Sequence, residues 1–168
     1  MQYVLLALVF SLCFFMNVKK STVGDSLNEQ VLLIRRVSKK TTGGNYSTFS
    51  ALVAVGDGKG NVGLGIAKDL EVPPAIKKAI VKAKKSMVPV SMNDSTIKHQ
   101  IFVKYKASRI LLKPAPKGTG LKVGGVVRVI LELAGVQDVS GKIIGSRNHI
   151  SNAYAVFKAI GKLKKGVN

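Results

Sequence analysis

Two apolar runs on either side of a glycine-rich turn decide how the first half of this chain can fold. FSALVAVGD precedes the turn and VGLGIAK follows it, and both runs are rich in apolar and β-branched residues. Asp57 and Gly58 stand between them, and an Asp-Gly pair in that position is a strong hairpin signal. We therefore expect two strands paired across the segment DGKGN, with Lys59 at the tip of the turn.

The hydrophobic period changes at Pro73 and predicts a helix. Proline suits the first turn of a helix, Asp69 and Glu71 just upstream complement the helix dipole, and Pro89 marks the expected end. The expected inward face consists of Ile76, Ala79, Ile80, Ala83 and Met87. The opposite face carries Lys77, Lys78, Lys82, Lys84 and Lys85, for which solvation and phosphate contact are equally good interpretations.

The remaining segments also read as strands, loops and helices. VLLIRRVS, residues 31–38, predicts an entering strand, and KKTTGGNYST after it is typical of a flexible loop or a hairpin tip. TIKHQIFVKYKASRILLKPA predicts two strands joined at YKAS, and VQDVSGKIIGS predicts a further strand and loop. GVVRVILELAG predicts a helix that ends at Gly135, and SNAYAVFKAIGKLKK predicts a last one. The inward face of that last helix is expected to hold Ala153, Val156, Phe157, Ile160 and Leu163.

The net charge of the chain indicates which class of partner it binds. Its 168 residues include 27 Lys and Arg against 8 Asp and Glu, a formal net charge of +19. Such self-repulsion calls for a polyanion, and nucleic acid is the leading candidate, with an anionic membrane surface second. Cys13 stands alone, so it can form neither an internal disulfide nor a cysteine-based metal site.

Catalysis and metal binding are disfavoured because the groups that support them are scattered. Six acidic residues lie without metal-ligand spacing: Asp57, Asp69, Glu71, Asp94, Glu132 and Asp138. The two histidines, His99 in an apolar strand and His149 in the turn SRNHIS, have no carboxylate or cysteine partner in sequence reach. We predict no enzyme, no metal and no cofactor.

One motif suggests a nucleotide cofactor, but the residues that follow it do not suit a dinucleotide site. Gly58, Gly60 and Gly63 match the dinucleotide fingerprint GxGxxG. That fingerprint needs a helix directly after the glycines, whereas LGIAKDLEVPP follows here, and residues 75–88 contain no acid to hold a ribose. Gly63 and Gly65 instead suggest that RNA or a neighbouring strand comes close.

Two glycine-rich basic segments are the candidates for phosphate contact. RRVSKKTTGGN and KPAPKGTGLKVGG each offer cations together with glycines, whose backbone amides a phosphate can approach, and the first adds hydroxyls. Tyr46 and Phe49 could stack on bases, but the low aromatic content favours packing for both. The predicted RNA-binding residues are Arg35, Arg36, Ser38, Lys39, Lys40, Thr41, Thr42, Gly43, Gly44, Lys59, Lys68, Lys77, Lys117 and Lys122.

The first 15 residues, mostly apolar, are set apart from the fold. They are too short to span a bilayer as a helix and lack the basic start of a secretory signal. An import leader, a membrane tether and an upstream extension before a true start at Met16 all stay open, and the last is favoured. Residues 16–30 then form a polar tail.

Two long segments resemble a known family. RRVSKKTTGGNYSTFSALVAVGDGKGNVGLGIAKDLEVPPAIKKAIVKAKKSMVPV resembles the signature region of the bacterial-type small-subunit ribosomal protein S5 family, and SRILLKPAPKGTGLKVGGVVRVILELAGVQDVSGKIIGSRNHISNAYAVFKAI resembles its second domain. The match runs in order from about Val31 to Ile160. Ala67 stands where a glycine is common in the family, and His149 where a proline is common.

The resemblance implies an α+β fold in two parts. Residues 31–93 would form a double-stranded-RNA-binding-like domain of three antiparallel strands and one helix, and residues 94–168 a four-stranded sheet backed by two helices. The boundary is expected at MNDS, residues 92–95.

The resemblance also implies a structural role in the small ribosomal subunit. Such proteins bind small-subunit rRNA, touch the fourth and eighth small-subunit proteins near the mRNA entry path and support decoding accuracy. The loop from Val37 to Tyr46 resembles the family's RNA-penetrating hairpin, near where spectinomycin binds. The face toward the fourth protein would include Arg109, Lys113, Gly118 and Gly120. The location would be a ribosome in a bacterial cytoplasm, a plastid or a mitochondrion, with no membrane partner.

Overall fold

The first half of the chain folds into an antiparallel sheet. The computed structural model describes residues 27–163, so the predicted segment 1–15 and most of the tail 16–30 lie outside the described residues. The sheet has the order β1-β2-β3-β4. Its strands are β1 (Asn28–Thr41), β2 (Gly44–Gly56), β3 (Asn61–Asp69) and the short β4 (Val88–Pro89). The hairpin predicted across DGKGN is confirmed, because β2 and β3 pair antiparallel on either side of it.

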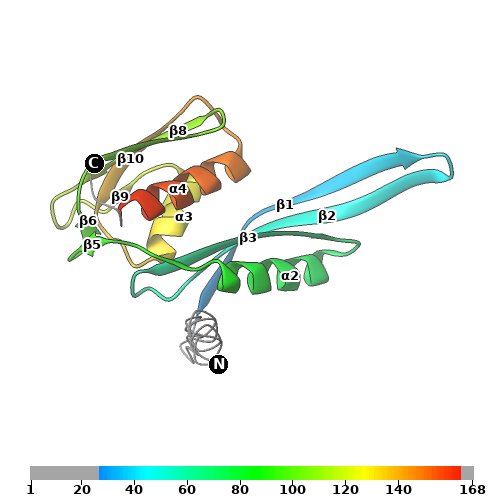
Figure 1. The fold of residues 1–168 in the computed structure, drawn as a ribbon, viewed down its shortest axis with the longest axis horizontal. Coiled ribbons are helices and arrows are strands. Elements are labelled where there is room, and N and C mark those ends of the chain that lie inside the picture. The colour runs from blue at the N-terminus through cyan, green and yellow to red at the C-terminus, as the bar shows by residue number, and fades with distance from the viewer. Residues whose placement is uncertain (1–26, 164–168) are drawn as a thin grey trace, which may run out of the picture.

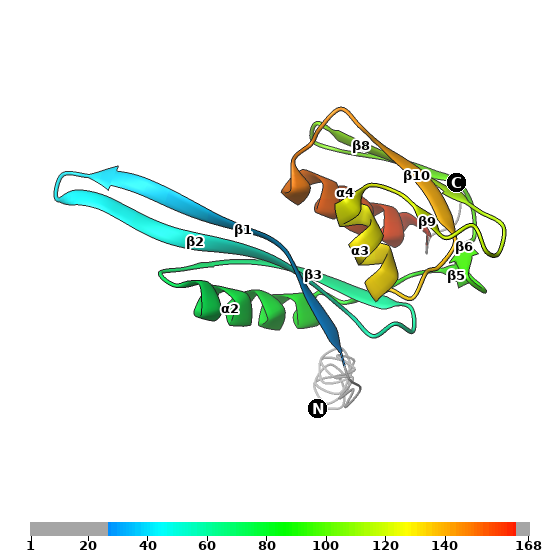
Figure 2. The ribbon, with the colours of Figure 1, turned by 180° about the vertical axis from the view of Figure 1, so that it is seen from behind.

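Two strands of this sheet project far beyond the others. The β1–β2 pairing continues to Thr41 and Gly44, whereas β3 reaches only as far as Phe49 of β2. Figures 1 and 2 show the result, a two-stranded arm that leaves the body of the molecule. We call residues 35–50 the basic ribbon.

The basic ribbon shows that KKTTGGN forms a hairpin tip, the second of the two structures expected there, rather than a flexible loop. Lys39 pairs with Tyr46 and Lys40 with Asn45, so only Thr42 and Gly43 remain as the turn. Gly44 has φ +129°, a backbone conformation that glycine adopts without strain and that allows the chain to reverse this tightly.

The helix α2 (Val72–Lys85) lies very close to β3. A Cβ on Gly63 would stand 2.2 Å from the carbonyl oxygen of Ala83, and one on Gly65 would stand 2.1 Å from that of Ala79. The neighbour that these glycines admit is therefore a helix, not RNA or a strand as expected. Prolines occupy the first turn as predicted, but the predicted end at Pro89 is wrong, because the helix ends at Lys85 and leaves Met87 beyond it.

The second half forms a four-stranded sheet with two helices, as the resemblance implied. The order is β7-β8-β10-β9, with β9 parallel to β10. The elements are β7 (Ile101–Tyr105), β8 (Ser108–Pro114), β9 (Leu121–Lys122), α3 (Gly125–Leu133), β10 (Val139–Ile144) and α4 (His149–Leu163), preceded by the short β5 (Met92–Asn93) and β6 (Thr96–Ile97). Gly135 follows α3 with φ +86°, the predicted left-handed cap. His99 lies in a bend before β7 rather than in a strand, which corrects its predicted place.

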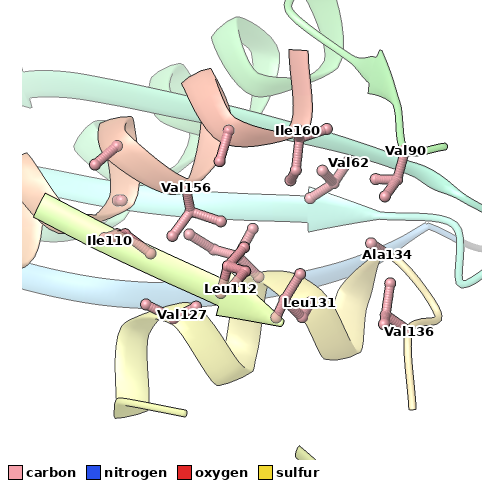
Figure 3. Packing of buried hydrophobic residues seen from close by; sticks show 14 of the residues in the cluster. Val62, Val90, Ile110, Leu112, Val127, Leu131, Ala134, Val136, Val156 and Ile160 are labelled. Atoms are coloured by element: carbon pink, nitrogen blue, oxygen red, sulfur yellow. The ribbon is translucent and has the colours of Figure 1, made fainter. Parts of the chain in front are cut away.

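The two halves stack in four layers and share their larger core. From one side to the other the layers are α2, the first sheet, the helices α3 and α4, and the second sheet (Figures 1 and 2). Figure 3 shows Val62 of the first sheet beside Ile160 of α4, in the larger core that also includes Val156 of α4 and Leu131 of α3. A smaller core between the first sheet and α2 holds Val53, Val55, Ala67, Ala79 and Ala83. Both faces of the first sheet are thus covered, except along the basic ribbon.

The DGKGN turn anchors the first sheet to the second half. The amides of Gly58 and Gly60 donate hydrogen bonds to the carbonyl oxygens of Leu133 (3.0 Å) and Ala134 (2.9 Å) at the end of α3. Asp57 closes the turn on its other side by accepting bonds from the amide of Lys59 and from Asn61. Burial alone would raise the pKa of Asp57, but these hydrogen bonds outweigh it and lower the pKa. The glycine amides that a dinucleotide would need are therefore already used within the protein.

Candidate nucleic-acid interface

The basic ribbon presents cations on both of its faces. Cross-strand partners in a sheet share a face and successive residues alternate, so Arg35 and Lys39 lie on one face and Arg36 and Lys40 on the other. All four side chains are exposed, and the sequence holds no acidic residue between Glu29 and Asp57. Ser38, Thr41, Thr42, Gly43 and Gly44 complete the exposed end of the ribbon. A polyanion can therefore meet positive charge from either side.

Tyr46 belongs to this exposed end as well. The expectation that it packs in the protein is wrong, because 52% of its surface is exposed. The reason is the length of the ribbon, since neither β3 nor a helix reaches far enough to cover it. Phe49, opposite Asp69 at the end of β3, is half-buried as expected.

A row of basic residues marks where the shared core ends. Leu33, Leu52 and Ile66 stand side by side across three strands and pack into that core. Two residues further along each strand, Arg35 and Lys68 flank Ser50 on the same face. The sheet face therefore changes from apolar to basic within one row, at the base of the ribbon.

The lysines of α2 form a second basic region beside this row. A shallow depression of about 420 Å³ is lined by Lys68, Lys77, Lys78, Lys82 and Lys85. Lys78 pairs with Asp69 at 2.5 Å, and Lys82 donates to the carbonyl oxygen of Ile66 at 3.2 Å. The hydrogen bond from Lys78 and that from the Leu70 amide lower the pKa of Asp69. Lys68 and Lys77 make no ion pair with any described residue, so their charges face solvent.

The other predicted RNA-binding residues lie apart from the ribbon. Lys59 is exposed on the DGKGN turn, at the opposite end of β2 from the ribbon tip. Lys117 and Lys122 belong to the second half, and Lys117 pairs with Asp94 at 3.3 Å. The fourteen predicted residues are all exposed, yet the structure gathers only the ribbon residues, Lys68 and Lys77 into one region.

The residues predicted to meet the fourth small-subunit protein lie on the second sheet and in a loop next to it. Arg109 and Lys113 alternate with buried residues on β8, and both are exposed. Gly118 and Gly120 lie in the loop before β9, with φ of +87° and +72°. Asp138 ties this loop down, because its carboxylate accepts bonds from the Gly120 amide (2.9 Å) and the Ser95 hydroxyl (2.8 Å).

Both halves of the chain match models of known protein families. Residues 27–91 match the family described as Ribosomal protein S5, N-terminal domain, and residues 103–166 match Ribosomal protein S5, C-terminal domain. The chain belongs to the ribosomal protein S5 family. This S5 protein is thus a ribosomal protein of the small subunit, in a family of structural proteins that work in translation on the ribosome, together with RNA and other ribosomal proteins.

Membrane crossing and metal binding each require a feature of their own. Within residues 27–163, no helix has both the length and the apolar character that a membrane crossing requires. In the same range, no three His, Cys, Asp or Glu side chains come together as metal ligands would.

We predict that this S5 protein loses stability in acid as the carboxylate of Asp138 becomes protonated. The bonds from Gly120 and Ser95 lower the pKa of its carboxyl below the ordinary 3.8, so its stabilising effect is full above that value. The effect is lost as pH falls through the lowered pKa. Urea unfolding from pH 6 downward is expected to show this loss in the wild type and a smaller one in Asp138→Asn. Parallel pH profiles for the two proteins would contradict the assignment.

Proposed function

We propose that this S5 protein binds small-subunit rRNA mainly through the basic ribbon and the adjoining residues Lys68 and Lys77. The observation that carries the proposal is the ribbon itself, a two-stranded arm with cations on both faces and no acidic residue. Positive side chains that neutralise phosphates supply most of the affinity for a nucleic acid and depend little on base sequence. The four-layer body holds the arm in a fixed orientation, which is what a structural subunit requires.

The second sheet is proposed to face another ribosomal protein. Phe102 and Ile144 expose 55% and 43% of their surface, and Arg109 lies beside Ile144 on the same outer face. Exposed apolar side chains rimmed by charged ones are typical of a protein interface. Together with the family resemblance, this supports contact with the fourth small-subunit protein. The same resemblance supports contact with the eighth protein, a place near the mRNA entry path and a role in decoding accuracy.

The protein is proposed to act without chemistry of its own. The GxGxxG motif, which gave the strongest argument for an enzyme, lies in a turn whose Gly58 and Gly60 amides bind α3. The proposed location is a bacterial cytoplasm or a bacterial-derived organelle, where the ribosome is of the matching type.

The salt dependence of rRNA binding tests this proposal. If the four ribbon cations, Lys68 and Lys77 each neutralise one phosphate of a duplex, a plot of log K against log salt has a slope of about −5. The affinity is then expected to fall roughly a thousandfold between 50 mM and 200 mM salt. Filter binding of the full chain to small-subunit rRNA measures the slope. An affinity that stays flat over this range would refute phosphate neutralisation as the mechanism.

A further inference from the structure

A second depression lies in the second half of the chain, away from the basic ribbon residues. Its volume is about 490 Å³. Gly125 at the start of α3, Ser146 and Arg147 in the loop after β10, and His149 and Asn152 of α4 line it. Two segments distant in sequence therefore meet here, the start of α3 and the stretch from the end of β10 into α4. Of these five residues, the sequence had pointed to Gly125, as part of the glycine-rich basic segment KPAPKGTGLKVGG, and to His149, as a histidine without a partner.

The potential in this depression is positive. The first turns of α3 and α4 both border it, and a helix amino terminus carries a partial positive charge. Neither helix has an acidic residue in its first turn, and the N-cap of α3, Gly124, makes no side-chain capping bond. Asn148 does cap α4 by accepting from the Ile150 amide, so α3 is the helix with open amides. Arg147 adds a full charge, and no carboxylate is among the lining residues.

Asn152 adds a polar group that lacks a partner. Its surface is 3% exposed, and its Oδ1 accepts a bond from the Ser108 hydroxyl at 2.6 Å. Its amide nitrogen donates to no described residue. Every fully buried side-chain nitrogen and oxygen of the described chain has a partner, so this nitrogen is accessible from outside, and Asn152 is among the residues that line the depression. An unpartnered donor in the wall of a positive depression favours an acceptor with negative charge.

The depression and the basic ribbon lie on the same side of the molecule. In Figures 1 and 2 the helix α4 begins at the end of the second half from which the β1–β2 arm projects. The row of Arg35 and Lys68 lies on the sheet face that α3 and α4 cover further along. One RNA laid along the ribbon can therefore reach the start of α4 as well.

We propose that this depression binds a phosphate group of RNA, as a second anchor besides the basic ribbon. Backbone amides at the start of α3, the Arg147 guanidinium and the Asn152 amide supply the donors that phosphate oxygens accept from. The inference rests on the proposed function, since it assigns a further contact to the same RNA.

Glycine 125 offers a variant that blocks the site without harming the fold. A Cβ built on Gly125 meets nothing within 4 Å, and an acidic side chain in the first turn stabilises a helix. Gly125→Glu therefore puts a carboxylate at the depression, and Arg147→Ala removes its cation. Gly161→Glu is the matched control, because that glycine is also open and lies in the last turns of α4.

The test uses the full chain and two probes, inorganic phosphate followed by amide chemical shifts, and small-subunit rRNA followed by filter binding. Phosphate is expected to shift the amide signals of Val126 and Arg147. Either variant, Gly125→Glu or Arg147→Ala, is expected to weaken phosphate binding about tenfold, because each loses one charge-assisted bond. The rRNA affinity should fall similarly, with Gly161→Glu unchanged.

Three results would overturn the inference: no phosphate shift in the wild type, equal losses in Gly161→Glu, or acetate binding as tightly as phosphate. The last would indicate a protein carboxylate as the occupant. If wild type binds rRNA and Gly125→Glu binds it equally well, this inference fails while the proposed function stands. A wild type that does not bind rRNA contradicts the proposed function itself.

Discussion

Replacing Arg35, Arg36, Lys39 and Lys40 together by glutamine is expected to weaken rRNA binding on the order of a thousandfold at 0.1 M salt. Each of these side chains is exposed and unpaired with any acid of the described chain, so each can release one counterion from the RNA. The slope of log K against log salt should therefore become shallower by roughly 3 to 4. Filter binding over a salt series measures both effects.

The control for this variant removes the same number of positive charges from another part of the protein. Lys98, Lys104, Lys158 and Lys162 are exposed on the second half, and their replacement by glutamine also lowers the net charge by four. This control should keep most of the affinity, and both variants should unfold at the wild-type temperature. Equal losses of affinity in the two variants would show that overall charge, rather than the basic ribbon, binds the RNA.

Gly65→Ala is expected to lower the free energy of unfolding by about 3 kcal/mol, the upper part of the range for overpacking a tight contact. The new Cβ would stand 2.1 Å from the Ala79 carbonyl oxygen and 2.7 Å from the Ala83 amide nitrogen. Both atoms belong to the backbone of α2, so no rotamer change can relieve the clash. The helix must move off the sheet and open the smaller core.

Gly161→Ala is the matched control for this effect. Its Cβ meets nothing within 4 Å, and alanine is favoured over glycine inside a helix by up to about 1 kcal/mol. Urea unfolding followed by circular dichroism compares the two variants. If Gly65→Ala is as stable as Gly161→Ala, the close approach of α2 to β3 is not present in solution.

Local signals predicted the elements that depend on neighbouring residues. Asp57 and Gly58 fixed the hairpin, Pro73 marked the first turn of α2, and Gly135 marked the end of α3, because each acts through its own backbone angles. The extent of the basic ribbon could not be predicted in the same way. Lys39 to Thr41 have the composition of a loop, and only their pairing with β2 makes them a strand.

Contacts between distant segments could not be predicted from the sequence, for a physical reason. Gly65 admits α2 rather than RNA, and nothing beside Gly65 in the sequence indicates which neighbour will approach. The bond between Ser108 and Asn152 joins residues 44 positions apart, and Asn152 lines a depression whose walls come from two distant segments. Residue types predicted which side chains carry charge, but only the fold shows which of them meet.

We propose above all that this chain is an RNA-bound structural component of the small ribosomal subunit. Sucrose-gradient sedimentation of the tagged protein from cells tests it most directly, and the intact mass of the recovered protein shows whether Met1 or Met16 begins the chain. We expect the protein to sediment with the small subunit and to leave it as salt is raised. Recovery at the top of the gradient or with lipid, at low salt, would contradict the claim.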